Sequence, residues 1–239
     1  MLESIQLTKS FGKLQALQGM SAQMNAGQAI SLIGPNGSGK TTLMKTILGL
    51  VRPESGEMFI EGESVLGGAE YRNVIGYMPQ IARFQDNLTA RELIAMIRDI
   101  RENPPGSREE ELCAMFDLAP HLGKQLKTLS GGTRQKVNAV LAFMFNPQIL
   151  MLDEPTAGLD PIAASTFKDL VLAEREAGRM ILLTSHIMSE VHELADTIVF
   201  LLEGNVYFQG ASAELLANTG ENTLERAIAR LLQEKNHSA

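Results

Sequence analysis

One segment of the chain has the residue types and spacing of a phosphate-binding loop. The sequence from Gly34 to Thr41 reads GPNGSGKT, fits the pattern GxxxxGK[ST] and follows an apolar run over Ala29–Ile33 that predicts a strand. Glycines let successive backbone N–H groups face one phosphate, and the positive end of the following helix faces the same charge. We expect Lys40 to reach the β- and γ-phosphates and the Thr41 hydroxyl to bind Mg²⁺. The alternative is a glycine-rich turn that only joins strand to helix. The binding residues predicted in this loop are Gly34, Pro35, Asn36, Gly37, Ser38, Gly39, Lys40 and Thr41.

Two adjacent carboxylates follow a second apolar run. Ile149–Leu152 predicts a strand that is buried on both faces, and Asp153 and Glu154 come directly after it. Open α/β sheets bind ligands beyond the carboxyl ends of their strands, so both acids are expected near a ligand. We expect Asp153 to hold Mg²⁺ through water and Glu154 to polarise the water that attacks the γ-phosphate. The alternative is a strand that ends in a solvated acidic turn.

Two further predicted strands end beside polar residues, one before Gln80 and the other before His186. If these strands are parallel and adjacent to the first two, then Lys40, Gln80, Glu154 and His186 converge on one edge of a sheet. We expect His186 to hydrogen-bond the γ-phosphate and Gln80 to contact the metal or the water. Taken singly, a histidine or a glutamine more often has a structural role.

A second candidate anion site lies before the helix predicted at Thr133–Phe145. Ser130, Gly131 and Gly132 precede this helix, where free N–H groups and the helix dipole favour an anion. Ordinary capping of the helix by Ser130 is the alternative. One nucleotide does not need two phosphate-binding loops in one chain. We therefore expect each loop to serve the nucleotide of a different subunit.

Length and composition bound the possible classes of protein. The chain has 239 residues, 44% of them hydrophobic and 21% charged, which suits one large α/β domain and excludes a disordered chain. A net charge of −7 argues against general binding to nucleic acid or anionic lipid. The single cysteine, Cys113, favours a reduced cytosolic compartment. No run approaches the roughly 18 apolar residues that cross a bilayer, so work at a membrane would depend on other subunits.

Short apolar runs alternate with longer amphipathic runs along the chain, which predicts mixed α/β structure. The pattern between Gln80 and Ser130 is mostly helical and predicts a helical insertion with a break at Asn103–Gly106. Strands are predicted at Glu3–Leu7, Ala29–Ile33, Met58–Ile60, Val74–Tyr77, Ile149–Leu152 and Met180–Thr184, with a hairpin formed by Ile198–Leu202 and Val206–Gln209. Helices are predicted at Thr41–Leu50, Ala90–Arg101, Arg108–Phe116, Thr133–Phe145, Pro161–Ala177, Ser189–Ala195 and Leu224–Gln233.

Over essentially its whole length the chain resembles the ATP-binding cassette ATPases. The segments GPNGSGKTT, YMPQ, LSGGT, ILMLDEP, AGLD and TSH occur in the order and spacing of that family. The resemblance implies an α/β fold, with a phosphate-loop NTPase core, an antiparallel β portion and an inserted helical subdomain. It also implies one ATP-binding domain over 1–239, the helical subdomain at 81–146 and a C-terminal helical tail at 211–239.

The resemblance assigns roles to individual residues. Two cassettes would sandwich two ATP molecules head to tail, so that Ser130, Gly131 and Gly132 of one copy face the γ-phosphate held by the other. Glu154 would be the catalytic base, His186 a phosphate-sensing switch, and Asp160 a residue that crosses the dimer interface. Thr42 would also bind the nucleotide.

Two of the implied roles have simpler alternatives, and one residue departs from the family. Phe11 falls where the family stacks an aromatic ring on adenine, but it could instead be a buried core residue. Asp160 before Pro161 is also a good helix start. The family most often has Gln where this chain has Thr133, at the rim of the second anion site. We expect this change to alter the ATPase rate and not to abolish activity.

The resemblance implies an ATP-hydrolysing nucleotide-binding subunit of a transporter, with ATP and Mg²⁺ as ligands. Its partners would be a second copy or a sister cassette, and integral membrane permease subunits that dock near Gln80–Leu93. It would lie in the cytoplasm on the inner face of the membrane, touching the membrane only through the permease and binding no nucleic acid. The alternative is a soluble, non-transport cassette ATPase that acts on ribosomes or DNA.

The cargo is left open by the sequence, and export is favoured over import. The C-terminal segment, which contains Thr219-Gly220 and Leu224–Ala227, is similar to bacterial exporters with one cassette, including drug and lipid types. Tyr71–Ile81 is similar to the copper-associated cassettes of nitrous oxide reductase maturation.

Overall fold

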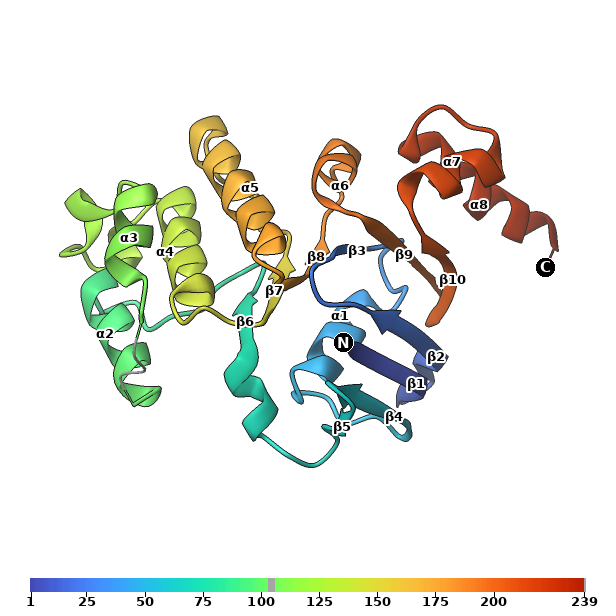
Figure 1. Cartoon of the computed structure of the whole chain (residues 1–239), viewed down its shortest axis with the longest axis horizontal. Helices are drawn as coiled ribbons and strands as arrows, with labels where there is room; N and C mark the ends of the chain where they lie inside the picture. The colour runs from blue at the N-terminus through green and yellow to red at the C-terminus, as the bar shows by residue number, and fades with distance from the viewer. Residues whose placement is uncertain (103–105, 239) are drawn as a thin grey trace. The chain divides into compact units, whose positions relative to one another are not determined.

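A computed structural model describes residues 1–102 and 106–238 of the chain (Figure 1). Residues 103–105, most of the predicted break in the helical segment, lie outside the described residues. The residue contacts divide the chain into two compact units. The first unit comprises Met1–Tyr71 and Thr184–Ala239, and the second comprises Arg72–Leu183.

An antiparallel sheet occupies the first part of the first unit. Its strand order is β2-β1-β4-β5. The sequence analysis missed β2, because its eleven residues, LQALQGMSAQM, contain none of the β-branched residues that favour strands. Its signal is a period of two, since Met20, Ala22 and Met24 are buried and alternate with exposed residues. The strands are β1 (Leu2–Phe11), β2 (Leu14–Met24), β4 (Ser55–Ile60) and β5 (Glu63–Ser64).

Three strands of the first unit surround the phosphate loop. β3 (Ala29–Ile33) is buried at every position and pairs in parallel with β9 (Thr197–Leu202). β9 then pairs antiparallel with β10 (Asn205–Gly210), which confirms the predicted hairpin. Its two connecting residues, Glu203 and Gly204, have φ values of 49° and 76°, as a two-residue turn with the twist of the flanking strands requires.

The C-terminal helices of the first unit pack on a common apolar core. Val191, Phe200, Leu215, Leu224 and Ala227 are all buried in this cluster. Burial of such side chains stabilises a fold by roughly 1.5–3 kcal/mol each. The predicted helix at Leu224–Gln233 corresponds to α8, whereas α7 was not predicted as a separate helix. The helices are α1 (Lys40–Ile47), α6 (Met188–Leu194), α7 (Ser212–Thr219) and α8 (Leu224–Ser238).

The second unit combines a parallel sheet with helices. β7 lies between β6 and β8, and β6 pairs with β7 in parallel, with Met78 opposite Leu152. Thr89 and Glu92 form a capping box at the start of α2. The strands are β6 (Ile75–Met78), β7 (Ile149–Asp153) and β8 (Met180–Thr184); the helices are α2 (Ala90–Ile100), α3 (Glu109–Met115), α4 (Gly131–Phe143) and α5 (Pro161–Glu176). Short 3₁₀ helices lie at η1 (Glu70–Val74), η2 (Ala119–His121) and η3 (Leu126–Thr128).

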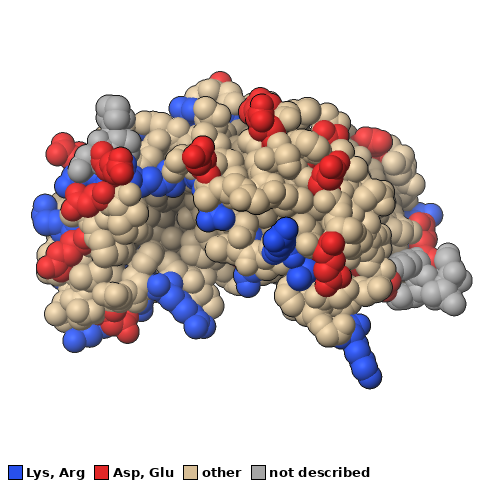
Figure 2. Space-filling model, turned by 90° about the horizontal axis from the view of Figure 1, so that it is seen from below, with Lys and Arg blue, Asp and Glu red and all other residues tan. Residues whose placement is uncertain are grey.

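Acidic and basic side chains are interspersed on the face drawn in Figure 2. The described residues of that face therefore carry no continuous field of one sign.

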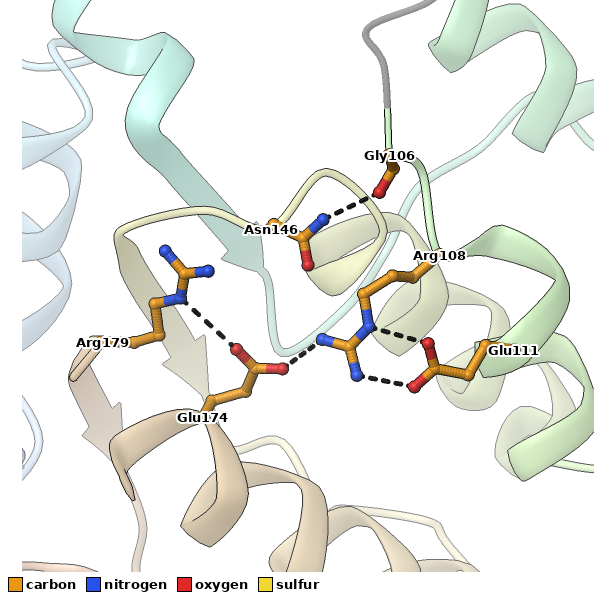
Figure 3. A network of polar contacts seen from close by, with 6 residues as sticks. All are labelled: Gly106, Arg108, Glu111, Asn146, Glu174 and Arg179. Atoms are coloured by element: carbon orange, nitrogen blue, oxygen red, sulfur yellow. Dashed lines mark hydrogen bonds and ion pairs between the residues drawn. The ribbon is translucent and has the colours of Figure 1, made fainter. Parts of the chain in front are cut away.

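A network of ion pairs joins α3 to α5 inside the second unit (Figure 3). The guanidinium of Arg108, just before α3, contacts the carboxylate of Glu174 on α5 and lies 2.8 Å from that of Glu111. The Nε of Arg179 lies 3.7 Å from the other Glu174 oxygen. The Glu174 side chain is only 7% exposed, whereas that of Glu111 is 54% exposed. Glu174 is therefore the buried centre of the network.

We predict that Glu174→Gln destabilises the protein, because it removes the buried anion that lies between Arg108 and Arg179. Loss of one partner from a buried pair predicts a decrease of about 3–5 kcal/mol in the free energy of unfolding. Glu111→Gln is the matched control, and it removes an exposed partner of Arg108, worth roughly 0–1 kcal/mol. Urea unfolding at neutral pH measures both values. Equal losses in the two variants would contradict a central role for Glu174.

Candidate functional site

The phosphate loop approaches neighbouring backbone so closely that two of its positions admit only glycine. Gly34 has φ 151° and Gly39 has φ 107°, both in the region that side chains disfavour. A Cβ at Gly34 would overlap the carbonyl oxygen of Leu201, and one at Gly39 would lie 2.6 Å from that of Ala16. The strand before the loop and the helix after it are confirmed.

Backbone hydrogen bonds fix the phosphate loop at Ser38. The carbonyl of Ser38 accepts from the N–H of Gly204 at 3.0 Å, and the carbonyl of Gly204 accepts from the N–H of Gln18 at 2.9 Å. The hairpin turn and β2 therefore fix the loop, although β2 itself gave little signal in the sequence. Ser38 is buried, while Asn36 and Gly37 are exposed at the tip.

The ammonium of Lys40 folds back over the loop. Its Nζ donates to the carbonyl of Gly34 at 2.6 Å and to that of Pro35 at 3.1 Å. These bonds hold a positive charge beside the exposed N–H groups of the loop, where an anion gains most from it. Thr41 and Thr42 follow in the first turn of α1, and Thr41 is exposed.

Phe11 and His186 belong to the same unit as the phosphate loop. Phe11 ends β1 with 50% of its surface exposed, so the buried-core alternative is wrong. The ammonium of Lys9 lies 5.4 Å from its ring centre. His186 is exposed after β8, in a turn held by buried Ser185, whose hydroxyl accepts from the N–H of Ile187 at 3.0 Å.

The paired carboxylates and Gln80 lie in the second unit. β6 and β7 are parallel neighbours, so Gln80 and the pair Asp153-Glu154 follow the same edge of this sheet. Glu154 has φ 49°, an uncommon backbone conformation for a residue with a side chain and one that concentrates at functional sites. Burial, and then the negative charge of Asp153, raise the pKa of Tyr77. Tyr77 is therefore a neighbour of the expected metal ligand.

The second candidate anion site is a well-capped helix start. Ser130 is exposed, and its hydroxyl accepts from the N–H of Thr133 at 3.1 Å, so ordinary capping is present. The Thr133 hydroxyl lies 2.8 Å from the same oxygen. The residue that departs from the family therefore holds the side chain of Ser130 directly. Gly131 and Gly132 form the first turn of α4.

Asp160 caps the next helix, as the sequence predicts. Its carboxylate accepts from the N–H of Ala163 at 2.9 Å and lies 3.1 Å from the Lys136 ammonium on α4. The Ala163 bond first, and then Lys136, hold the pKa of Asp160 below its ordinary value.

A cavity of about 580 Å³ lies within the second unit, beside the start of α4. Its lining includes Gln80, Phe84, Gly131, Arg134 and Gly158. The segment after β6, the second anion site and the loop before α5 therefore border one cavity.

The comparisons with known proteins agree on one family. The family model described as "ABC transporter" matches residues 17–157, more than half of the 239 residues. The chain belongs to the ABC transporter ATP-binding family. Membership makes it an ATPase that binds ATP, and the fold is that of an ABC ATPase cassette.

Individual ABC proteins match most of this chain. An uncharacterised ABC transporter ATP-binding protein of Synechocystis sp. is 32% identical over 93% of the chain and 67% of its own length. The daunorubicin resistance ATP-binding protein DrrA3 of Streptomyces coeruleorubidus is 33% identical over 91% of the chain and 70% of its own length. The chain thus spans about two thirds of these ABC relatives.

A solved ATP-binding subunit of an ABC transporter has the same fold. It superposes with a TM-score of 0.89 at 28% identity and covers 97% of this chain and 99% of its own. Among the helices that the structure describes, none has both the length and the apolar character to span a membrane.

We predict that Lys40→Ala weakens ATP binding, because it removes the charge held over the phosphate loop. A charge-assisted hydrogen bond to a phosphate is worth roughly 1.5–3 kcal/mol, which corresponds to an increase of about 10- to 100-fold in Kd. Titration with a fluorescent ATP analogue measures the change. Lys45→Ala, which removes an exposed lysine of the same helix, is the control and should leave the affinity unchanged. Equal affinities in the two variants would refute the assignment of the loop.

Proposed function

We propose that the chain is the ATP-hydrolysing, nucleotide-binding subunit of an ABC exporter and works as a dimer. The observation that carries this proposal is the presence of two glycine-containing helix starts, one at Gly34–Thr41 and one at Ser130–Gly132. Each is fixed by hydrogen bonds to its own surroundings. A chain with both can bind the phosphates of one ATP and present a second anion site to the ATP of its partner.

The first copy binds the nucleotide with its phosphate loop. Backbone N–H groups of the loop and the ammonium of Lys40 stabilise the phosphate charge, and the exposed ring of Phe11 stacks on adenine. The oxygen atoms of Thr41, Gln80 and Asp153 are of the type that Mg²⁺ prefers, and bound Mg²⁺ would neutralise charge on the phosphates.

Glu154 acts as the base in the hydrolysis reaction. Its carboxylate accepts a proton from the attacking water, and His186 donates a hydrogen bond to the γ-phosphate. Convergence of these residues, which come from both units, on one nucleotide is part of the proposal.

The partner copy completes the site. Ser130, Gly131 and Gly132 of that copy face the γ-phosphate, and its Asp160 crosses the interface. Each ATP is bound by both copies, so ATP binding joins them. Hydrolysis then removes the γ-phosphate that holds the copies together. Each copy in this proposal has a helical subdomain at 81–146 and a C-terminal tail at 211–239.

The output of this cycle is movement of a permease. We infer that integral membrane permease subunits dock near Gln80–Leu93, which keeps the chain on the cytoplasmic face of the membrane. The name of the Streptomyces relative, a daunorubicin resistance protein, supports export. The alternative is a soluble, non-transport ATPase that acts on ribosomes or DNA.

We predict that Glu154→Gln abolishes turnover and traps a dimer in ATP. The amide binds water but cannot take its proton, so the γ-phosphate stays between the two copies; the loss of rate should be at least about 100-fold. Size-exclusion chromatography with light scattering measures the mass with and without ATP. Glu176→Gln, on the exposed face of α5, is the control and should hydrolyse ATP normally. A monomer at saturating ATP would contradict the shared site.

The transport part of the proposal has a separate test. A tagged Glu154→Gln chain, expressed in its native cells and captured from detergent-solubilised membranes with ATP present, should recover a protein with several membrane spans in a fixed ratio. Mass spectrometry identifies what is recovered, and the untagged chain is the control. Recovery with ribosomes or DNA, and without a membrane protein, would favour the alternative.

A further inference from the structure

Two amide side chains on α4 are buried in the second unit. Asn138 is 2% exposed and Gln135 is 6% exposed. They are three residues apart, so they lie on the same face of the helix. Neither is explained by helix propensity or by the anion site at the helix start, which lies at Ser130–Gly132.

Each amide donates a hydrogen bond to the carbonyl of a proline beside a predicted catalytic residue. The Nδ2 of Asn138 donates to the carbonyl of Pro79 at 2.9 Å, and the Nε2 of Gln135 donates to that of Pro155 at 3.0 Å. Pro79 directly precedes Gln80, and Pro155 directly follows Glu154. Asn138 also lies 3.4 Å from the Gln135 side-chain oxygen, which links the two contacts.

These bonds fix the positions of two strand ends relative to one helix. β6 ends at Met78 and β7 at Asp153, so Pro79 and Pro155 lie beyond the ordered hydrogen bonds of the sheet. A buried carbonyl without a partner costs roughly 1–3 kcal/mol, and the amides satisfy the carbonyl of buried Pro155 and that of half-buried Pro79. An apolar side chain could fill the same space, but it would not set the position of either carbonyl.

We propose that Asn138 and Gln135 are positioning residues that hold Gln80 and Glu154 in register with the second anion site. The inference rests on the proposed function, because it gives Gln80 and Glu154 their roles. Both amides project from the same rigid helix that begins with Gly131 and Gly132. Helix α4 therefore holds the residues that act on the ATP of its own copy. It also carries the residues that face the ATP of the partner copy.

Two ion pairs join α4 to the same two segments as the amides do, but their side chains are more exposed. Arg134 lies 3.2 Å from Asp86, in the segment after Gln80, and Lys136 lies 3.1 Å from Asp160, in the segment after Glu154. Exposed pairs contribute little and are screened by salt. The buried amides are therefore the part of this connection that persists at physiological ionic strength.

The test replaces Asn138 by Asp and, in a second variant, by Leu. Aspartate keeps the shape but its carboxylate cannot donate to Pro79, and leucine keeps the bulk without adding a buried charge. We expect kcat to fall about tenfold or more while the KM for ATP changes by less than about twofold, because ground-state binding uses the phosphate loop. Asn218→Asp makes the same chemical change at an exposed position of α7 and should match the wild type.

Hydrogen exchange adds a readout that does not depend on turnover. In the nucleotide-free full chain, amides of residues 80–84 should exchange faster in both Asn138 variants, while those of β3 stay unchanged. If the Asp variant does not fold, the Leu variant carries the same test.

Two outcomes separate this inference from the proposed function. A lower melting temperature with unchanged kcat per folded molecule and unchanged exchange at 80–84 would show that Asn138 only stabilises the fold, and the inference would be wrong. A wild-type chain that neither hydrolyses ATP nor dimerises would defeat the proposed function, while the exchange experiment would still decide whether Asn138 positions the segment.

Discussion

The structure depends on one constraint: a helix start that binds phosphate must keep its N–H groups available, so other contacts must hold its backbone. Gly34 and Gly39 allow the loop to lie directly against neighbouring carbonyls, where a side chain would not fit. The hydrogen bond from Gly204 to Ser38 then fixes it from the side away from the tip. The hairpin and β2 therefore hold the loop that is proposed to bind the nucleotide.

The second anion site satisfies the same constraint in a different way. Ser130 caps α4 with its side chain, and the Thr133 hydroxyl shares that oxygen, so the cap is held more firmly than by one bond. A hydroxyl oxygen that accepts bonds within its own helix keeps its O–H for a phosphate of another copy, but the bonds restrict the direction in which that O–H points. Thr133 in place of glutamine would thus adjust the rate of the proposed cycle through Ser130 and leave the N–H groups of the loop as they are.

The sequence predicts those parts of the fold and site whose causes are local. The glycines and Lys40 identify the phosphate loop, four successive apolar residues identify β7, and Asp160 before a proline marks the start of α5. The strand β2 is missed, because it contains no β-branched residue, although Met20, Ala22 and Met24 alternate with polar or exposed residues. Asn138 and Gln135 also look like ordinary polar residues of a helix. Their importance comes from carbonyls far away in the sequence, which only the folded chain brings to them.

A shared site makes the position of α4 part of the chemistry. In the proposed cycle, the γ-phosphate of one ATP is bound at the start of the partner's α4, while the side of that same helix holds Pro79 and Pro155 of the partner's own site. A helix moves as a rigid body over such distances, so a displacement at its first turn also displaces the two carbonyls. ATP binding at one site would in this way bias the geometry of Gln80 and Glu154 at the other. Coupling of this kind needs an element that belongs to both sites, and α4 begins at the second anion site and donates to Pro79 and Pro155 from its side.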